Sequence, residues 1–247
     1  MYVYLYDTFL KDKKHAAFLQ NCENRLTDFG IFGKVIRITS FTNPGAILQD
    51  EMRRGVKSVI IVGNDDTFAR VISRSAHLPL IFGFIPVGEH SEIAEILGIP
   101  TNESACDVIS RRKIERVDVG SMNDRFFFRQ IFIEGVKATV VCDNIFSVEA
   151  NEEAEIAVCN LDVPLWVDRK QVHPQDGCLS VYIRPSKRSF FGKKFEKPTI
   201  LQAKHVQIRA AKPFFSTIDG IQAKEQYIDA RVTDKTFSVI VGKERKF

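Results

Sequence analysis

Residues 58–73 read SVIIVGNDDTFARVIS and contain the pattern on which the fold depends. An apolar run ends at a short polar turn, and apolar residues then recur at helical spacing. This is typical of a strand that leads through a phosphate-binding loop into a helix. Such loops normally carry glycine, but here Asn64 and Asp66 stand in the turn. The stretch therefore predicts a strand, a turn and a helix, and it raises the question of whether the turn holds a phosphate.

The sequence up to about residue 112 continues this alternation of strands and helices. Strand patterns occur at residues 2–6, 34–38, 58–62 and 78–88, and helical patterns occur at 8–29, 44–55, after Asp66 and at 90–100. The third strand is apolar throughout, as expected for a strand that is covered on both faces. This alternation predicts an α/β fold with a parallel sheet and crossover helices.

From residue 113 onward the pattern changes to short runs in which apolar and polar residues alternate, with turns between them. Little of this half has helical spacing. Short alternating strands of this kind are typical of an antiparallel β-sandwich. We therefore expect two domains, an α/β domain at residues 1–112 and a β-sandwich domain at residues 113–247.

The composition is that of a globular protein with a sizeable core, since 45% of the 247 residues are hydrophobic and 27% are charged. The net charge of +4 permits an anionic partner without demanding one. Five scattered cysteines without CxxC spacing argue against a disulfide framework and a zinc site. Because the chain shows neither a signal-peptide pattern nor an apolar run approaching ~18 residues, we expect a cytoplasmic protein.

Five short patterns follow one another along the chain. They are GNDDT at 63–67, PVGEHSEIA at 86–94, ERVDVG at 115–120, DGCLSV at 176–181 and DGI at 219–221. In this order the chain resembles the diacylglycerol and sphingosine kinase family of lipid kinases over nearly its whole length. The resemblance implies an α/β nucleotide-binding domain like those of NAD kinases and diacylglycerol kinases, followed by a β-sandwich domain for the lipid substrate.

The resemblance also implies ATP-dependent phosphoryl transfer to a lipid hydroxyl, of diacylglycerol or a sphingoid base, with Mg²⁺. Its candidate nucleotide-binding residues are Gly63, Asn64, Asp66, Thr67, Gly88 and Glu89. Asp65 would organise the phosphates and Mg²⁺, and Asp176 matches a metal position of the family. The family's late Asp-Gly-Glu supplies the general base as its Glu. Here Ile221 replaces that Glu, so Asp219 is the remaining candidate.

The positions that depart from the family's motifs are those expected to bind phosphates or to supply the general base. Asn and Asp tolerate positive φ, so the turn can keep its shape, but Asp66 and Glu89 bring carboxylates where phosphates are expected. Two like charges ~4 Å apart repel by roughly 4 kcal/mol at an effective dielectric near 20, although a bound Mg²⁺ reverses the sign. Ile221 cannot accept a proton, and general-base catalysis contributes ~10²–10⁴ in rate. We therefore expect an activity that is weak or lost.

Each of these residues also has a simpler interpretation. Asp65 or Asp66 would cap the helix that follows the turn, and Glu89 would be an acid near a helix N-terminus. The Asp-Gly pairs at 176–177 and 219–220 would be turns. On that interpretation the chain is a non-catalytic module that binds a lipid or a nucleotide, and a kinase that uses a different phosphate donor or acceptor is a further alternative.

The basic stretch at residues 184–198, RPSKRSFFGKKFEKP, carries six Lys or Arg residues against one Glu, with three Phe between them. Basic and aromatic residues together suit the surface of an anionic membrane. This stretch therefore predicts peripheral contact with a membrane or lipid substrate, and its simpler interpretation is a solvated loop. The sequence indicates no specific nucleic acid and no oligomeric state.

Overall fold

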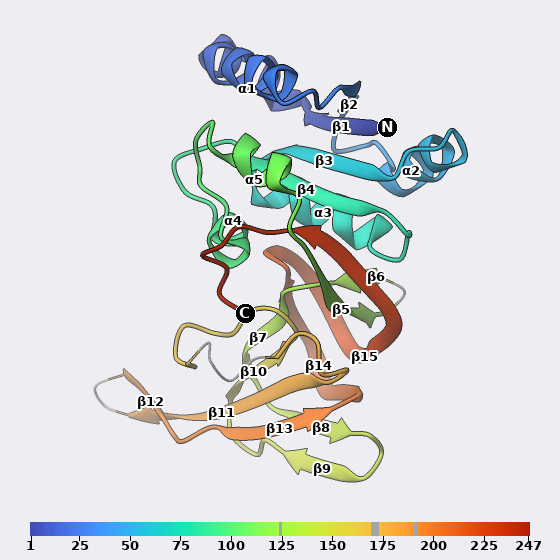
Figure 1. Cartoon of the computed structure of the whole chain (residues 1–247). Helices are drawn as coiled ribbons and strands as arrows, with labels where there is room; N and C mark the ends of the chain where they lie inside the picture. Colours follow the sequence, from blue (N-terminus) through green and yellow to red (C-terminus); the bar gives the residue numbers. More distant parts are fainter. Residues whose placement is uncertain (124, 169–172, 190–191) are drawn as a thin grey trace. The chain divides into compact units, whose positions relative to one another are not determined.

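A computed structural model describes residues 1–123, 125–168, 173–189 and 192–247 (Figure 1). The chain forms two compact units. The first contains residues 1–117 and 236–246, and the second contains residues 118–235 with Phe247. A single boundary at residue 112 does not capture this arrangement, because the C-terminal stretch returns to the first unit.

The first unit is built on a parallel sheet. Its strands are β1 (Tyr2–Asp7), β2 (Gly33–Ile38), β3 (Ser58–Gly63), β4 (Ile81–Pro86) and the end of β15 (Ile221–Ile240). Their order across the sheet is β15-β4-β3-β1-β2, and all of these pairings are parallel. Every residue of β3 is buried, as its apolar sequence predicts for a strand covered on both faces.

Five α-helices connect these strands or follow them. They are α1 (Ala16–Asp28), α2 (Pro44–Arg53), α3 (Asp65–Ser75), α4 (Glu92–Leu97) and α5 (Ala105–Arg111). Helix α1 contacts α5, and α2 contacts α3. The predicted helix at 8–29 is shorter than expected, because Asp7 and Asp12 cap two 3-10 helices, η1 (Thr8–Lys11) and η2 (Lys13–His15), before α1 begins.

Aromatic residues fill the core of the first unit. The rings of Phe68 and Phe84 lie 4.8 Å apart, and Phe237 lies 5.1 Å from Phe82 and 6.3 Å from Phe68. All four side chains are fully buried. Phe237 belongs to the end of β15, so burial of its large apolar surface explains why this late stretch joins the first unit.

Within its described residues, the secondary structure of the second unit consists of strands joined by turns and loops. The strands are β5 (Ile114–Met122), β6 (Arg125–Phe127), β7 (Gln130–Val136), β8 (Ala138–Cys142), β9 (Phe146–Glu149), β10 (Ala154–Cys159), β11 (Leu179–Ser189), β12 (Gly192–Phe195), β13 (Thr199–Ala203), β14 (His205–Ile218) and most of β15. Their pairings are antiparallel, and a large aliphatic core lies among them. The predicted fold class, α/β followed by an antiparallel β region, is confirmed.

The late part of the chain is more continuous than its sequence suggests. The strand patterns that the sequence shows at 226–233 and 236–242 both belong to one strand, β15. The single pattern at 200–210 is divided between β13 and β14, and β14 continues to Ile218. The pairing of β14 with β15 shifts between Arg209 and Phe214. Pro213 lies in this interval, and because proline has no backbone N–H it cannot donate to the ladder. No described helix is long and apolar enough to span a membrane.

Candidate functional site

The turn before α3 is a helix cap. Asn64 has φ −96° and ψ −177°, and its side-chain oxygen accepts a hydrogen bond from the Thr67 backbone N–H at 3.0 Å. A Cβ on Gly63 would lie 2.7 Å from the Thr67 hydroxyl, so glycine is required there by close packing. The expected use of positive φ at Asn64 and Asp66 is wrong. Both residues have ordinary backbone geometry, because the chain enters the helix directly.

Asp65 points away from its own helix and caps the next one. Its carboxylate accepts hydrogen bonds from the Ser91 hydroxyl and from the backbone N–H of Glu92, at 2.8 Å for the latter. A longer contact of 3.4 Å joins it to the Ile93 N–H. Ser91 in turn accepts the Ala94 N–H at 3.0 Å. The first turn of α4 is thus satisfied by Asp65 and Ser91 together.

Thr67 connects the turn to the end of β1. Its hydroxyl lies 2.8 Å from both the Asn64 side-chain oxygen and Asp7 Oδ2. Arg70 donates to the same Asp7 oxygen at 2.6 Å. Burial alone would raise the pKa of Asp7, but the hydrogen bonds from Thr67 and Arg70 outweigh it and hold the pKa below its usual value. Asp7 was not predicted as a site residue, and it is the last residue of β1.

The remaining predicted residues of the first unit lie on exposed turns. Gly88 and Glu89 are exposed in the connection between β4 and α4, and Gly88 has φ 135°, which favours glycine. Asp66 is exposed at the start of α3 and has no partner among the described residues. Asp66 and Glu89 therefore present free carboxylates, whereas the backbone N–H and the hydroxyl of Thr67 are already hydrogen-bonded within the protein.

In the second unit, Asp219 is held tightly inside a turn. Asp219 and Gly220 connect β14 to β15 with positive φ at both positions. The Asp219 carboxylate accepts the backbone N–H groups of Phe128, Arg129 and Gln130 at 2.8–3.1 Å. Burial raises its pKa to about 6, although these three donors oppose the shift. Both carboxylate oxygens are thus engaged in fixing the stretch at 128–130.

Ile221 follows this turn as the first residue of β15, and 42% of its surface is exposed. An aliphatic side chain there supplies neither a proton acceptor nor a metal ligand. The structure therefore places an apolar group where the family's motif has a Glu.

Asp176 lies in another turn, where its carboxylate accepts the Cys178 N–H at 2.9 Å. The neighbouring Gly177 N–H donates to Asp118 at 2.8 Å. Burial, and then the nearby charge of Asp176, raise the pKa of Asp118. Asp118 was not predicted as a site residue, although the ERVDVG pattern contains it. Among the residues that the structure describes, no three His, Cys, Asp or Glu side chains form a group that could hold a metal ion.

The basic stretch at 184–198 forms the end of β11, β12 and the residues after it, with Phe190 and Phe191 outside the described residues. Arg184 lies 4.2 Å from the Trp166 ring and 3.9 Å from the Phe195 ring, and it pairs with Glu155. Lys187 pairs with Glu196 and Lys193 with Glu134, whereas Lys194 and Lys197 have no partner among the described residues. Much of the predicted positive charge is thus neutralised locally.

Known proteins are similar to this chain in sequence and in fold. The family model for the diacylglycerol kinase catalytic domain matches residues 6–122. A curated diacylglycerol kinase of Staphylococcus saprophyticus is 39% identical over 72 residues, which cover 28% of this chain and 24% of that protein.

Solved structures match along the whole chain. A diacylglycerol kinase structure from Bacillus anthracis has a TM-score of 0.79 at 18% identity, covering 99% of this chain and 97% of that one. A putative diacylglycerol kinase from the same organism has a TM-score of 0.77 at 17% identity, covering 98% of each chain.

The fold is that of these solved structures, and residues 6–122 match the family model in sequence. The resemblance to the diacylglycerol kinase family is confirmed, by sequence over residues 6–122 and by fold over nearly the whole chain. The family implies ATP as phosphate donor. The residues at the start of α3 do not fit a triphosphate held by the backbone, because Asn64 covers the Thr67 N–H and Asp66 adds an exposed negative charge.

Proposed function

We propose that this chain is a diacylglycerol-kinase-like protein in which ATP-dependent phosphorylation of a lipid hydroxyl is weak or lost. The observation that carries the proposal is the position of Asp65. Its carboxylate is engaged by Ser91 and by the backbone of Glu92, so a role toward phosphates or Mg²⁺ would compete with the cap of α4.

The charges around the turn support the same proposal. Asp66 and Glu89 are exposed acids, and Arg70, one turn further along α3 from Asp66, is bound to Asp7. A carboxylate ~4 Å from a phosphate costs roughly 4 kcal/mol at an effective dielectric near 20, and less where water screens it. Since each 1.4 kcal/mol is about tenfold in affinity, a micromolar nucleotide site becomes a roughly millimolar one.

A general base for the lipid hydroxyl, the phosphate acceptor, is also missing among the candidate site residues that the structure describes. Ile221 stands where the family's general base is expected, and Asp219 uses both oxygens to bind backbone N–H groups. Without a base near the lipid hydroxyl, ~10²–10⁴ in rate is lost. Retained lipid or nucleotide binding without turnover is the alternative that fits the same residues.

The test is phosphoryl transfer from radiolabelled ATP to diacylglycerol, sphingosine or monoacylglycerol in mixed micelles. We expect turnover far below the ~10 s⁻¹ of a typical enzyme. Combining Ile221→Glu with Asp66→Gly supplies a base and removes a repelling charge, so the pair should give measurable transfer where neither change does alone.

The matched control combines Ile221→Gln with Asp66→Gly, because glutamine has the shape of glutamate and cannot act as a base. Transfer restored by the Glu pair and absent from the Gln pair supports the proposal. Turnover by the unmodified chain within tenfold of a typical enzyme contradicts it.

We also propose that the basic stretch at 184–198 contacts anionic lipid. Lys194 and Lys197 carry this proposal, since both are exposed and without a partner in the described part of the chain. Near a charged membrane each cation contributes ~1 kcal/mol, so binding would be weak and reversible. Phe195, 38% exposed, adds a small apolar surface.

A further inference from the structure

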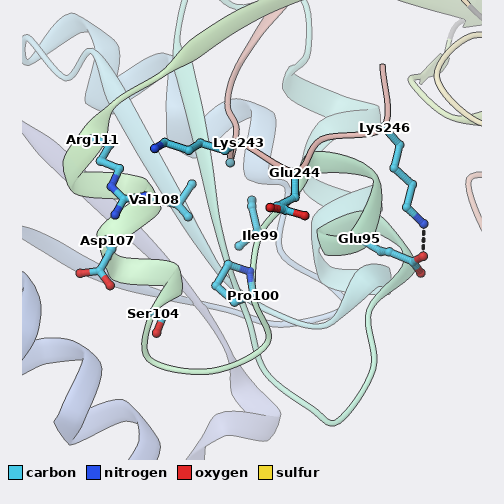
Figure 2. A pocket seen from close by; sticks show the side chains of 12 residues that line it. Glu95, Ile99, Pro100, Ser104, Asp107, Val108, Arg111, Lys243, Glu244 and Lys246 are labelled. Atoms are coloured by element: carbon cyan, nitrogen blue, oxygen red, sulfur yellow. Dashed lines mark hydrogen bonds and ion pairs between the residues drawn. The ribbon is translucent and has the colours of Figure 1, made fainter.

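The first unit contains a pocket of about 570 Å³, and no residue of the turn before α3 lines it (Figure 2). Its walls come from helix α5, from Gly98–Pro100 after α4, and from the C-terminal residues 242–246. A volume of this size is within the ~300–1,000 Å³ typical of small-molecule sites.

Close backbone contact fixes one wall of the pocket. A Cβ on Gly242 would lie 1.7 Å from the Gly98 carbonyl oxygen, and a Cβ on Gly98 would lie 2.4 Å from the Arg245 backbone nitrogen. The Gly242 N–H also donates to the Leu97 carbonyl at 2.9 Å, and the Lys246 N–H donates to Ile96 at 3.0 Å. The C-terminal stretch is therefore held against the end of α4, and the pocket is preformed.

Two of the acids that line the pocket are already paired. Asp107 receives two hydrogen bonds from the Arg25 guanidinium on one oxygen and one on the other, at 2.7–3.0 Å. Glu95 forms an ion pair with Lys246, drawn as a dashed line in Figure 2. These two acids therefore present little uncompensated charge to a ligand.

Two cations at the pocket remain unpaired. Arg111 on α5 and Lys243 have no partner among the described residues, and Figure 2 shows the Lys243 side chain extending toward the end of α5 that carries Arg111. Ile99 and Val108, both largely buried, give the pocket an apolar floor. Glu244 lines the other side with a carboxylate that has no described partner.

We propose that this pocket binds a small organic phosphate that also carries hydroxyl or amine groups. An Arg fork beside a Lys ammonium is suited to a phosphate, since guanidinium binds it with paired hydrogen bonds and the ammonium adds a point charge. The body of the ligand lies on Ile99 and Val108, and its hydroxyl or amine groups donate to Glu244. The inference is independent of the proposed kinase chemistry.

The probe is adenosine monophosphate, compared with adenosine, which lacks the phosphate, and with inorganic phosphate, which lacks the body. Calorimetric titration of the full chain should show that adenosine monophosphate binds at least tenfold more tightly than either. Arg111→Ala and Lys243→Ala should each weaken this binding tenfold or more. Arg74→Ala, an exposed arginine in the last turn of α3, is the matched control and should leave it unchanged.

A second variant tests whether binding needs the open volume of the pocket, and it leaves the charges unchanged. Ser104→Trp would fill the pocket, and because the Ser104 side chain makes no capping hydrogen bond its loss should not disturb α5. This variant should abolish binding while its far-ultraviolet spectrum stays unchanged. Amide NMR signals should shift at Gly98 and Gly242. The proposal is overturned if nothing binds up to millimolar concentration, if the variants bind as well as the parent, or if the shifts occur at Gly63 instead.

Discussion

Replacing Asp65 with Ala tests whether this residue serves helix α4. The side chain accepts two short hydrogen bonds, from Ser91 Oγ and from the Glu92 N–H, together with the longer one from Ile93. Hydrogen bonds to a charged group contribute about 1.5–3 kcal/mol each, but water can replace part of this at a half-buried site. Loss of a helix cap costs about 0.5–2 kcal/mol. We therefore expect Asp65→Ala to lower the free energy of unfolding by about 2 kcal/mol.

Two assays measure this loss. A change of 1 kcal/mol shifts the melting temperature by about 2–4 °C in a chain of this size, so Asp65→Ala should melt roughly 4–8 °C lower. The effect should also be local. Amide hydrogen exchange in α4, residues 92–97, should become roughly thirtyfold faster, because 1.4 kcal/mol corresponds to a factor of ten.

The control is Asp66→Ala, which removes the same group one residue along the chain. Asp66 is exposed and without a described partner, so the change in stability should stay within about 0.5 kcal/mol. If the two variants have the same melting temperature and α4 exchanges at the parent rate in both, then Asp65 does not cap α4. Its carboxylate would then be free to take part in binding phosphates or Mg²⁺.

Two other expectations concern Asp219 and the basic stretch at 184–198. Because burial raises the folded-state pKa of Asp219 to about 6 from 3.8, its contribution to stability is fully present below pH 3.8 and is lost as pH rises through 6. At 1.36 kcal/mol for each pKa unit this is roughly 3 kcal/mol over the whole range, so the stability difference between the parent and Asp219→Asn should fall by about 2.4 kcal/mol between pH 4 and 7, as measured by urea unfolding. A difference that is independent of pH would show that Asp219 titrates normally. Sedimentation with vesicles containing phosphatidylserine should be weakened by Lys194→Glu/Lys197→Glu more than by Lys187→Ala, whose cation is paired with Glu196. Equal pelleting of all forms, or no dependence on the anionic lipid, would reduce the stretch at 184–198 to a solvated loop.

The sequence was sufficient for the fold where the hydrophobic pattern was strong. The continuous apolar run of β3 and the helical spacing after it correctly placed a buried strand and α3. Element boundaries were less predictable, because local capping decided them. The helix expected from residue 8 begins at Ala16, since Asp7 and Asp12 each stabilise a 3-10 turn first.

The contacts of the site residues were beyond prediction from one sequence. The GNDDT pattern located the turn, but nothing local indicates that Asp65 reaches Ser91, 26 residues on, or that Thr67 meets Asp7, 60 residues back. The same holds for Asp219, whose carboxylate binds the stretch at 128–130, where the chain enters β7 beside β14. Such contacts depend on how the sheet brings strand ends together.

Calorimetric titration of the chain with Mg-ATP measures whether the turn before α3 holds a nucleotide triphosphate. The cap formed by Asn64, the engagement of Asp65 and the exposed charge of Asp66 predict a dissociation constant in the millimolar range or no measurable heat. A micromolar constant would contradict this prediction.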